Sequence, residues 1–422
     1  MTTAKLTKNG FFAILVFAFP GQLLGAGFAV FTQGADALGQ GLATTAHGST
    51  PEVIFYNPAL INRLDGTQIE NGVTFIAPMR DFHSNRVNIT AETEGEVFFP
   101  LTIYLSHKYS EKVSLGVGIF SPFGLSTEWG GNWEGRYITT NAELRTLNFN
   151  PVASFQLTPS TSVAAGPDFL LVDATLENKL NFSALGLPDG NQKFSGNGFG
   201  VGFNLGIHSE LTQNIAFGVS YRSEIEVDID GDAEFDLPTP VLSPAFPNTD
   251  GRTDITFPQQ LHAAMAYSGI DRLTLEVGVR WEDWSSFDEL RIELEQPVNG
   301  VTTSVSPRDW HDTLTLTTGG RYQLNDRIAL LAGFVWGEDP IPDETFDPIV
   351  TDANHYAVTF GTEIGIHKHR LSLAYSFQKW DDRVKNNDVG TAFSGGAVPD
   401  ARANGEYEAS SHFLALSFTY VF

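Results

Sequence analysis

The stretch that decides the fold is the carboxyl end of the chain, Phe413-Leu-Ala-Leu-Ser-Phe-Thr-Tyr-Val-Phe422. Taken in steps of two, its residues separate into an apolar face and a small or polar face, which is the period of a β-strand. The apolar face holds His412, Leu414, Leu416, Phe418, Tyr420 and Phe422, and the other face holds Ser411, Ala415, Ser417 and Thr419, with Phe413 and Val421 as exceptions. A strand of this kind that finishes on an aromatic residue is typical of the closing strand of an outer-membrane β-barrel.

The first residues predict export. Lys5 and Lys8 precede an apolar run over residues 11–20, and small residues follow it. This pattern indicates a secretory signal peptide, which we place at residues 1–25, so that the mature chain starts at Ala26. The apolar run is shorter than the ~18 residues that a spanning helix needs.

Composition excludes several classes of function. The chain contains no Cys, so disulfide frameworks and thiol chemistry are absent. Its formal net charge is -25, and the loss of Lys5 and Lys8 with the leader makes the mature chain about -27. Such acidity argues against nucleic acid as a partner. We expect the carboxylates on solvated outer loops, beside lipopolysaccharide.

Alternating segments begin at Thr67 and continue to the end of the chain. We expect fourteen strands, an even number as in bacterial single-chain barrels. They are predicted at 67–80, 97–109, 112–121, 143–158, 161–180, 196–210, 213–230, 252–268, 271–295, 309–324, 327–337, 354–366, 368–380 and 407–422.

The connections between these strands alternate strictly between short and long. Long connections are expected at 81–96, 121–142, 181–195, 231–251, 296–308, 338–353 and 381–406. Short periplasmic turns and long outer loops alternate in this way in outer-membrane barrels, whereas a soluble sandwich has no reason to do so. The predicted class is therefore all-β, a fourteen-stranded antiparallel transmembrane barrel. A soluble up-and-down barrel would place the apolar faces inward instead.

Motifs for catalysis or metal binding are missing. The chain has no Gly-x-Ser-x-Gly elbow and no His-Glu-x-x-His spacing, and His367 and His369 flank a tight turn. The glycine run 196–202 has a period of two, which predicts a strand whose inner face leaves room for a ligand or a plug. We predict no catalytic residue, no metal and no cofactor, and a barrel enzyme is the least favoured alternative.

Residues 26–64 are rich in Gly and Ala and precede the first strand. They contain Asn57-Pro58-Ala59, in which Asn-Pro is a strong turn signal. The segment is either a periplasmic tail or a plug in the lumen, because a fourteen-stranded barrel is wide enough to leak if empty. We place the barrel itself at residues 65–422.

Several motifs occur together and in a fixed order along the chain. They are Ala26-Gly27-Phe28, Asn57-Pro58-Ala59, Ser121-Pro-Phe-Gly-Leu-Ser-Thr127, Trp129 to Tyr137, Leu144-Arg-Thr-Leu-Asn-Phe-Asn150, Trp281-Glu-Asp-Trp-Ser-Ser-Phe-Asp288, Trp310-His-Asp312 and Asp339-Pro-Ile-Pro342. With these motifs the chain resembles, over essentially its whole mature length, the FadL-type outer-membrane transporters of long-chain fatty acids and, in one branch, aromatic hydrocarbons.

The resemblance implies that residues 26–64 form a movable hatch, with Ala26, Gly27, Phe28, Asn57, Pro58 and Ala59 as its characteristic residues. It further implies capture of a hydrophobic ligand among the outer loops and sideways release at a kink in the third strand. Gly116 and Gly118 lie in that strand and are candidate kink positions, although they are equally readable as ordinary inward glycines.

The loop 121–142 supplies candidate ligand contacts. We expect Phe123, Leu125, Trp129 and Trp133 to be exposed aromatic and apolar residues suited to ligand capture, with packing within the loop or contact with lipopolysaccharide as the alternative. Arg136 and Arg145 are basic residues in an acidic chain, and their guanidinium groups suit a ligand carboxylate.

We therefore expect an outer-membrane uptake channel for hydrophobic small molecules, with long-chain fatty acids as the first substrate class. Uptake of alkanes or monoaromatic hydrocarbons is the alternative, and a general hydrophilic porin is less favoured. We expect a monomer in contact with outer-membrane lipid and lipopolysaccharide, assembled by the barrel-assembly machinery through Phe422.

Overall fold

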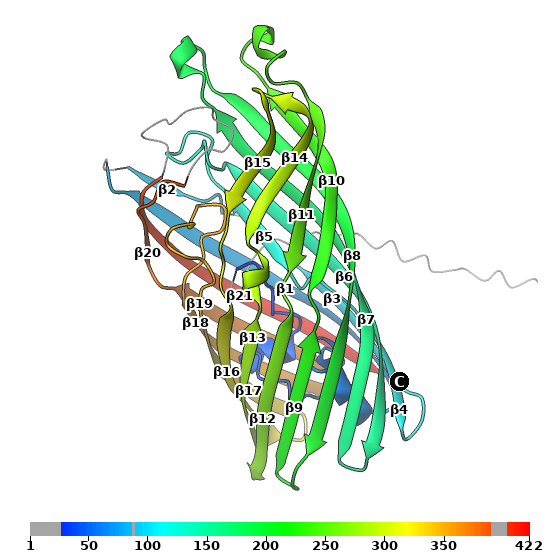
Figure 1. Ribbon diagram of the computed structural model, residues 1–422. Helices are drawn as coiled ribbons and strands as arrows, with labels where there is room; N and C mark the ends of the chain where they lie inside the picture. Colours follow the sequence, from blue (N-terminus) through cyan, green and yellow to red (C-terminus); the bar gives the residue numbers. More distant parts are fainter. Residues whose placement is uncertain (1–26, 87–88, 96, 390–402) are drawn as a thin grey trace, which may run out of the picture.

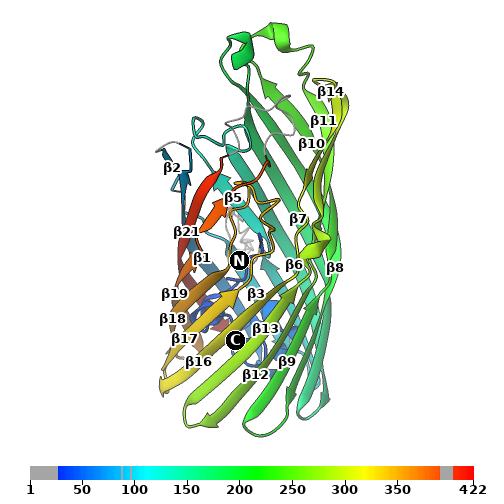
Figure 2. The same cartoon turned by 60° about the vertical axis from the view of Figure 1, so that its left-hand side comes forward.

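The computed structural model describes residues 27–86, 89–95, 97–389 and 403–422, so the expected leader and Ala26 lie outside the described residues. The chain forms an antiparallel sheet that closes on itself. Strand β1 (Thr67–Ser84) pairs with β21 (Gly405–Val421) along their whole length, which joins the two ends of the barrel sequence (Figures 1 and 2).

Fourteen staves make the wall, as predicted, where a stave is one crossing of the wall by a single strand or by two consecutive strands. Five of the staves are interrupted. The uninterrupted staves are β1, β3 (Leu101–Lys108), β6 (Asn141–Thr158), β7 (Thr161–Leu180), β8 (Gly190–Glu210), β17 (Ile328–Gly337), β18 (His355–Ile366), β19 (His369–Trp380) and β21. The interrupted staves are β4 (Val113–Phe120) with β5 (Gly124–Glu128), β9 (Ile215–Arg222) with β10 (Ile225–Asp236), β11 (Thr249–Phe257) with β12 (Gln260–Ile270), β13 (Leu273–Glu282) with β14 (Glu289–Val298), and β15 (Val301–Pro307) with β16 (Thr313–Asn325). Short strands β2 (Thr90–Glu92) and β20 (Arg383–Lys385) extend two outer loops.

The interruptions correct the predicted continuous strands at 213–230, 252–268 and 271–295, whereas the predicted strand 309–324 is found as the continuous β16 and starts four residues later. Pro258 and Pro307 lie at two of the breaks, where a residue without an N–H cannot donate to the ladder. The predicted loop 296–308 is also wrong, because β14 and β15 form a hairpin there. Asn299 and Gly300 make its turn with φ of 49° and 81°, the left-handed pair of a type I′ turn.

The side chains of the wall point apolar groups outward. In β21 the outward Leu414, Leu416 and Phe418 are 37–46% exposed, whereas Ala415 and Ser417 between them are 1–2% exposed. This arrangement suits lipid outside the wall and is the reverse of a soluble barrel. Among the described residues, no helix is long and apolar enough to cross a membrane.

The two ends of the barrel differ. Short turns join strands at one end, which we take as periplasmic, and long loops with the one-turn helices η2 (Ser183–Leu185) and η3 (Pro240–Leu242) lie at the other. Figure 1 shows β10, β11, β14 and β15, together with the paired ends of β7 and β8, rising beyond the rest of the wall at the loop end.

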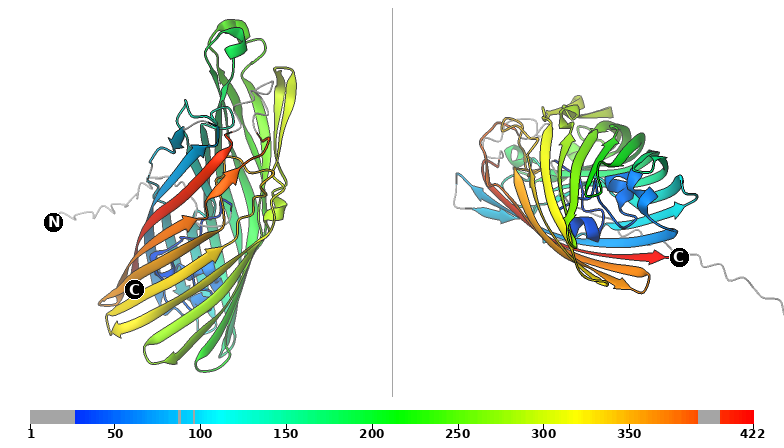
Figure 3. Two further views of the ribbon diagram at one scale, coloured as in Figure 1. Left: turned by 90° about the vertical axis from the view of Figure 1, so that its left-hand side faces the viewer. Right: turned by 90° about the horizontal axis from the view of Figure 1, so that it is seen from below.

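Residues 27–64, called the plug below, fold inside the ring of strands, as the view from below in Figure 3 shows. The plug contains α1 (Ala35–Gly39), α2 (Val53–Tyr56) and the 3-10 helix η1 (Pro58–Arg63), and almost all of it is buried. Inward glycines of the wall make room for it. A Cβ on Gly319 would lie 1.9 Å from the carbonyl oxygen of Gln40, so the plug backbone packs directly on the wall backbone.

Candidate functional site

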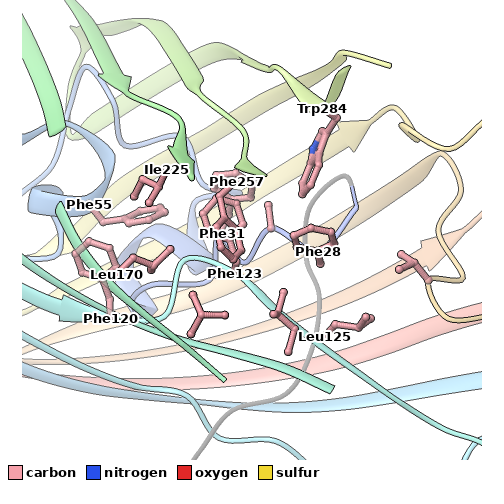
Figure 4. Close-up of a cluster of buried hydrophobic side chains, with 14 of the residues drawn as sticks. Phe28, Phe31, Phe55, Phe120, Phe123, Leu125, Leu170, Ile225, Phe257 and Trp284 are labelled. Atoms are coloured by element: carbon pink, nitrogen blue, oxygen red, sulfur yellow. The ribbon is translucent and has the colours of Figure 1, made fainter. Parts of the chain in front are cut away.

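An aromatic cage surrounds Phe28 near the start of the plug (Figure 4). Its members are Phe123, Phe257, Trp284, Phe287 and Trp310, whose ring centroids lie 4.6–6.4 Å from that of Phe28. Each of these rings comes from, or borders, an interruption in a stave. The breaks in the wall therefore let aromatic side chains turn into the lumen at one level.

Local structure explains how the cage is presented. Between β13 and β14 the chain makes the 3-10 helix η4 (Trp284–Ser286), which turns Trp284 inward so completely that its side chain is fully buried. Phe257 is the last residue of β11, directly before Pro258. Rings in the cage meet mostly edge to face, the geometry that aromatic quadrupoles favour.

Gly27 fixes the position of Phe28. Its φ is +63°, and a Cβ there would lie 2.7 Å from the Trp310 ring, so glycine is required on both conformational and steric grounds. The Gly27 N–H donates to Oδ2 of Asp352 at 2.6 Å, and the indole N–H of Trp380 donates to Oδ1 at 2.9 Å. Burial raises the pKa of the Asp352 carboxyl well above its usual range.

Two polar atoms in the cage lack partners. The indole N–H groups of Trp284 and Trp310 are buried and make no hydrogen bond with the described residues. An unsatisfied buried donor is costly, and such groups are often found where a ligand or water binds. The cage is thus an apolar site with two donors available.

The plug also fills a gap in the wall at the third stave. Strand β5 pairs with β6 on one side, and on its other side the described residues contribute no strand, only isolated bridges. The Val30 N–H donates to the Pro122 carbonyl at 2.8 Å, and the Gly124 N–H donates to the Phe28 carbonyl at 2.9 Å. The plug therefore takes the place of a strand partner for residues 122–124, on the side of the third stave that faces away from β6.

Gly116 and Gly118 do not form this gap. Both pair in regular register with β3 and β6, and the interruption lies after Phe120, at residues 121–123. These glycines instead receive Ile54 of the plug, since a Cβ on Gly116 would lie 2.9 Å from its Cδ1. The structure thus locates the bend of the third stave beyond the two predicted positions.

Asn57 secures the plug to the opposite wall. Its side-chain amide donates to the carbonyls of Thr45 at 2.8 Å and Ile207 at 2.9 Å. Its Oδ1 accepts the Ala59 N–H at 3.1 Å and so caps η1, whose first residue is Pro58. The Asn-Pro-Ala motif therefore joins a helix start inside the plug to β8.

The loop aromatics are buried, which corrects the expectation of an exposed capture surface. Trp129 and Trp133 stack at 4.4 Å and are 2% and 5% exposed. They pack against Phe82 and Tyr407 from the opposite ends of the barrel sequence. Leu125 is also buried, and Phe123 belongs to the cage.

The two arginines are already paired with protein carboxylates. Arg136 donates to Asp189 at 2.9 Å and to the Tyr137 hydroxyl at 2.8 Å. Arg145 pairs with Glu143, two residues away on the same strand. Their positions leave neither guanidinium in the cage.

Sequence reasoning missed the cage residues Phe257, Trp284, Phe287 and Trp310 as site residues. The available signal was an aromatic beside a break, most clearly at Phe257-Pro258. The room predicted on the inner face of the glycine run 196–202 is occupied by the wall itself, because Ile225 and Val227 of β10 pack there. In the described part of the chain no group of three or more His, Asp or Glu residues is arranged to hold a metal ion.

A closed barrel with outward apolar faces, a luminal plug and an aromatic site at a wall gap defines an outer-membrane channel protein. The family model described as outer membrane protein transport protein (OMPP1/FadL/TodX) matches residues 16–422. The chain belongs to this family, and it is accordingly an outer-membrane transport protein and not an enzyme.

Known relatives agree over the full length. Long-chain fatty acid transport proteins of Salmonella typhi and Escherichia coli (strain K12) are 22% and 21% identical, each aligned over 100% of both chains. Among solved structures, a Pseudomonas aeruginosa FadL homologue has a TM-score of 0.84 and 19% identity, covering 94% of this chain and 100% of its own. The P. putida toluene transporter TodX has a TM-score of 0.74 and 18% identity, covering 92% and 98%. These likenesses support the fold.

Proposed function

We propose that this protein takes up hydrophobic small molecules across the outer membrane and releases them sideways at the third stave. A ligand enters from the loop end and displaces Phe28 from the aromatic cage. Residues 26–64 act as the hatch, whose first residues leave the gap at 121–123 and open a path into the bilayer. Lateral release keeps the ligand out of water, which is worth about 0.8 kcal/mol per CH₂.

The observation that carries this proposal is the pair of main-chain hydrogen bonds between the plug and residues 122–124. They mean that the wall at this point is completed by a segment that is not part of the wall. The carbonyl of Phe28 accepts one of those bonds while its ring lies in the cage, so displacement of the ring and opening of the gap are mechanically coupled. A general hydrophilic porin needs an open polar lumen, and the buried plug is unfavourable for that alternative.

Long-chain fatty acids are the first substrate candidates from the sequence, and several relatives are named as their transporters. Alkanes and monoaromatic hydrocarbons are the second candidates, supported by a cage composed of aromatic rings. The pairing of Arg136 and Arg145 with protein carboxylates is unfavourable for their proposed contact with a ligand carboxylate.

We propose a single barrel as the working unit, because one chain contains both the cage and the gap. The outward apolar faces would contact outer-membrane lipid and lipopolysaccharide. Phe422 is 62% exposed at the periplasmic rim and is accessible to the assembly machinery.

The test is saturable uptake of labelled palmitate, hexadecane and toluene by cells that lack their own transporter, together with binding to the purified barrel. Phe28→Ala should bind ligand about tenfold more tightly, since no ring has to leave the cage, whereas Trp284→Ala should bind more weakly. Phe149→Ala is the matched control, because Phe149 lies on the outer face of β6 and is 45% exposed. Heat-modifiable mobility on gels confirms that each variant is folded, and absence of saturable uptake for all three compounds would contradict the proposal.

A further inference from the structure

A cavity of about 480 Å³, separate from the aromatic cage, lies in the mouth of the barrel at the loop end. Strands β7, β8, β14 and β15 form its walls, and the loop 338–354 closes one side. Its floor is apolar and includes Ile138, Leu176, Phe194, Leu290, Ile292 and Ile349. Its lower end reaches Asp309, one residue before Trp310 of the aromatic cage, so a molecule held here is next to the site proposed above.

The charged residues that line this cavity are all acidic in the described part of the chain. They are Glu177, Asp309, Glu344, Asp347 and Asp388. Glu177 is paired with Lys193 at 3.7 Å. Asp347 is paired with Arg308 at 2.6 Å. Asp309 and Glu344 are exposed and form no ion pair within the described ranges. The local field therefore disfavours an anion.

Two buried polar groups of the lining lack hydrogen-bond partners. The Thr139 hydroxyl and the Gln192 Oε1 make no hydrogen bond with the described residues, although the two residues are only 1% and 6% exposed. The Gln192 Oε1 and the carboxylates at the rim only accept hydrogen bonds, and the Thr139 hydroxyl both accepts and donates. The cavity thus combines an apolar floor with an excess of acceptors.

We propose that this cavity captures hydrophobic molecules whose polar end donates hydrogen bonds, as in a long-chain alcohol or amine, and discriminates against carboxylates. The apolar body of the ligand lies on the floor, and its O–H or N–H group donates to Thr139, Gln192 or the rim carboxylates. A carboxylate of the same chain length brings a negative charge towards Asp309 and Glu344 and has no hydrogen to donate. This inference rests on the proposed function and names the ligand class of its capture step, and it places long-chain fatty acids behind ligands without a carboxylate among the substrate candidates.

A matched series of ten-carbon ligands tests the inference: decane, 1-decanol, decylamine and decanoate. Binding to the detergent-purified full chain is measured at neutral pH and low salt by displacement of a fluorescent fatty-chain probe. We expect decanol and protonated decylamine to bind at least tenfold more tightly than decanoate. Added salt should weaken decylamine binding and leave decanol binding unchanged.

Charge reversal provides the sharper comparison. Glu344→Lys should strengthen decanoate binding and weaken decylamine binding, each at least fivefold. Asp250→Lys is the matched control, because Asp250 is an exposed carboxylate on the outer face of β11 and does not line the cavity. Thr139→Val removes one acceptor at nearly constant volume and should weaken decanol three- to tenfold relative to decane.

The outcomes separate two failures. If all four ligands bind and decanoate equals decanol, or if Glu344→Lys leaves the order unchanged, this inference is wrong while the transport proposal stands. If none of the four binds saturably, the proposed function itself fails.

Discussion

The third and seventh staves are both broken, but the two breaks are filled in different ways. At the third stave the plug residues Phe28 and Val30 hydrogen-bond to the wall and occupy the space between β4 and β5. At the seventh stave β8 pairs with β9 up to Asn204 and with β10 from Gly198, and the stretch between lacks a registered partner on that side. Here the wall fills its own break.

The seventh stave closes by side-chain packing against glycine. Ile225 and Val227 of β10 lie on the inner face of β8, where a Cβ on Gly200 would lie 2.5 Å from Ile225. Ser223 adds two hydrogen bonds: its N–H donates to the Phe203 carbonyl at 2.9 Å, and its hydroxyl oxygen accepts the Phe203 N–H at 2.9 Å. The residues that fill the break at the seventh stave belong to the wall strand β10, whereas those that fill the break at the third stave belong to the plug. An interrupted stave can therefore act as a gate only if the segment that fills the interruption is able to move out of it.

The largest expected effect is from locking the plug to the third stave. Ala29 and Phe123 pair across an antiparallel bridge, a spacing compatible with a disulfide, and the native chain has no Cys. The oxidised Ala29→Cys/Phe123→Cys protein should lose at least nine-tenths of its uptake, and reductant should restore the level of the reduced variant.

Thr74→Cys/Ala415→Cys is the control for this lock, because these residues pair within the continuous wall between β1 and β21. Its oxidation should leave uptake unchanged. Full transport by the oxidised plug lock would mean that ligands leave by another route, and the comparison of the two staves would lose its functional meaning.

An intermediate effect is expected when a methyl group is added at each stave. Gly198→Ala places its Cβ 2.3 Å from the Asp228 carbonyl oxygen, a backbone atom that cannot easily move. Overpacking of this kind costs about 1–3 kcal/mol, so less folded barrel should be seen by heat-modifiable mobility. Gly116→Ala meets two side-chain methyl groups, Cδ1 of Ile54 at 2.9 Å and Cγ2 of Val152 at 3.0 Å, and its nearest backbone atom is the Leu105 carbonyl oxygen at 3.3 Å, so barrel folding should be affected less. Equal losses of folded barrel would show that the two fillings are equally rigid.

The smallest expected effect is a dependence of plug docking on pH. Burial, reinforced by Glu363 and opposed by Arg321, raises the pKa of Asp36 in α1 to about 7. The folded state therefore binds a proton more strongly than the unfolded chain, and plug docking should weaken as pH rises from about 4 to 7. The slope is at most about 1.4 kcal/mol per pH unit.

Hydrogen exchange of plug amides at pH 5 and pH 8 would measure this dependence, and Asp36→Asn should reduce it. Amides of Ile225 and Val227 serve as the internal control, because the side chains that fill the break at the seventh stave are apolar. An unchanged slope in Asp36→Asn would assign the dependence to other buried carboxyls.

The sequence predicted the wall well because alternation is a local property. The faces of β21 are those read from residues 411–422, and fourteen staves are present. The hairpin turn at Asn299-Gly300 was equally predictable, because Asn-Gly between apolar residues is a strong hairpin signal. The pairing of Arg145 was also foreseeable, because Glu143 lies two residues away on the same face of a strand.

The site was less predictable because its contacts join distant parts of the chain. Trp129 is buried by Tyr407, and Phe28 is enclosed by Trp284 and Trp310. No local pattern reports such a contact, and a loop aromatic reads as exposed until the element covering it is known.

The pairing of β1 with β21 has a consequence for the order of assembly. The plug precedes β1 in the chain and β21 follows all the other strands, so the plug has been synthesised before the final ladder can form. Joining ends separated by about 350 residues costs roughly 5 kcal/mol of loop-closure entropy before any hydrogen bond forms between them. Contacts of such long sequence separation also form slowly. The slow closure of the barrel between β1 and β21 therefore leaves time for the plug to enter the lumen first.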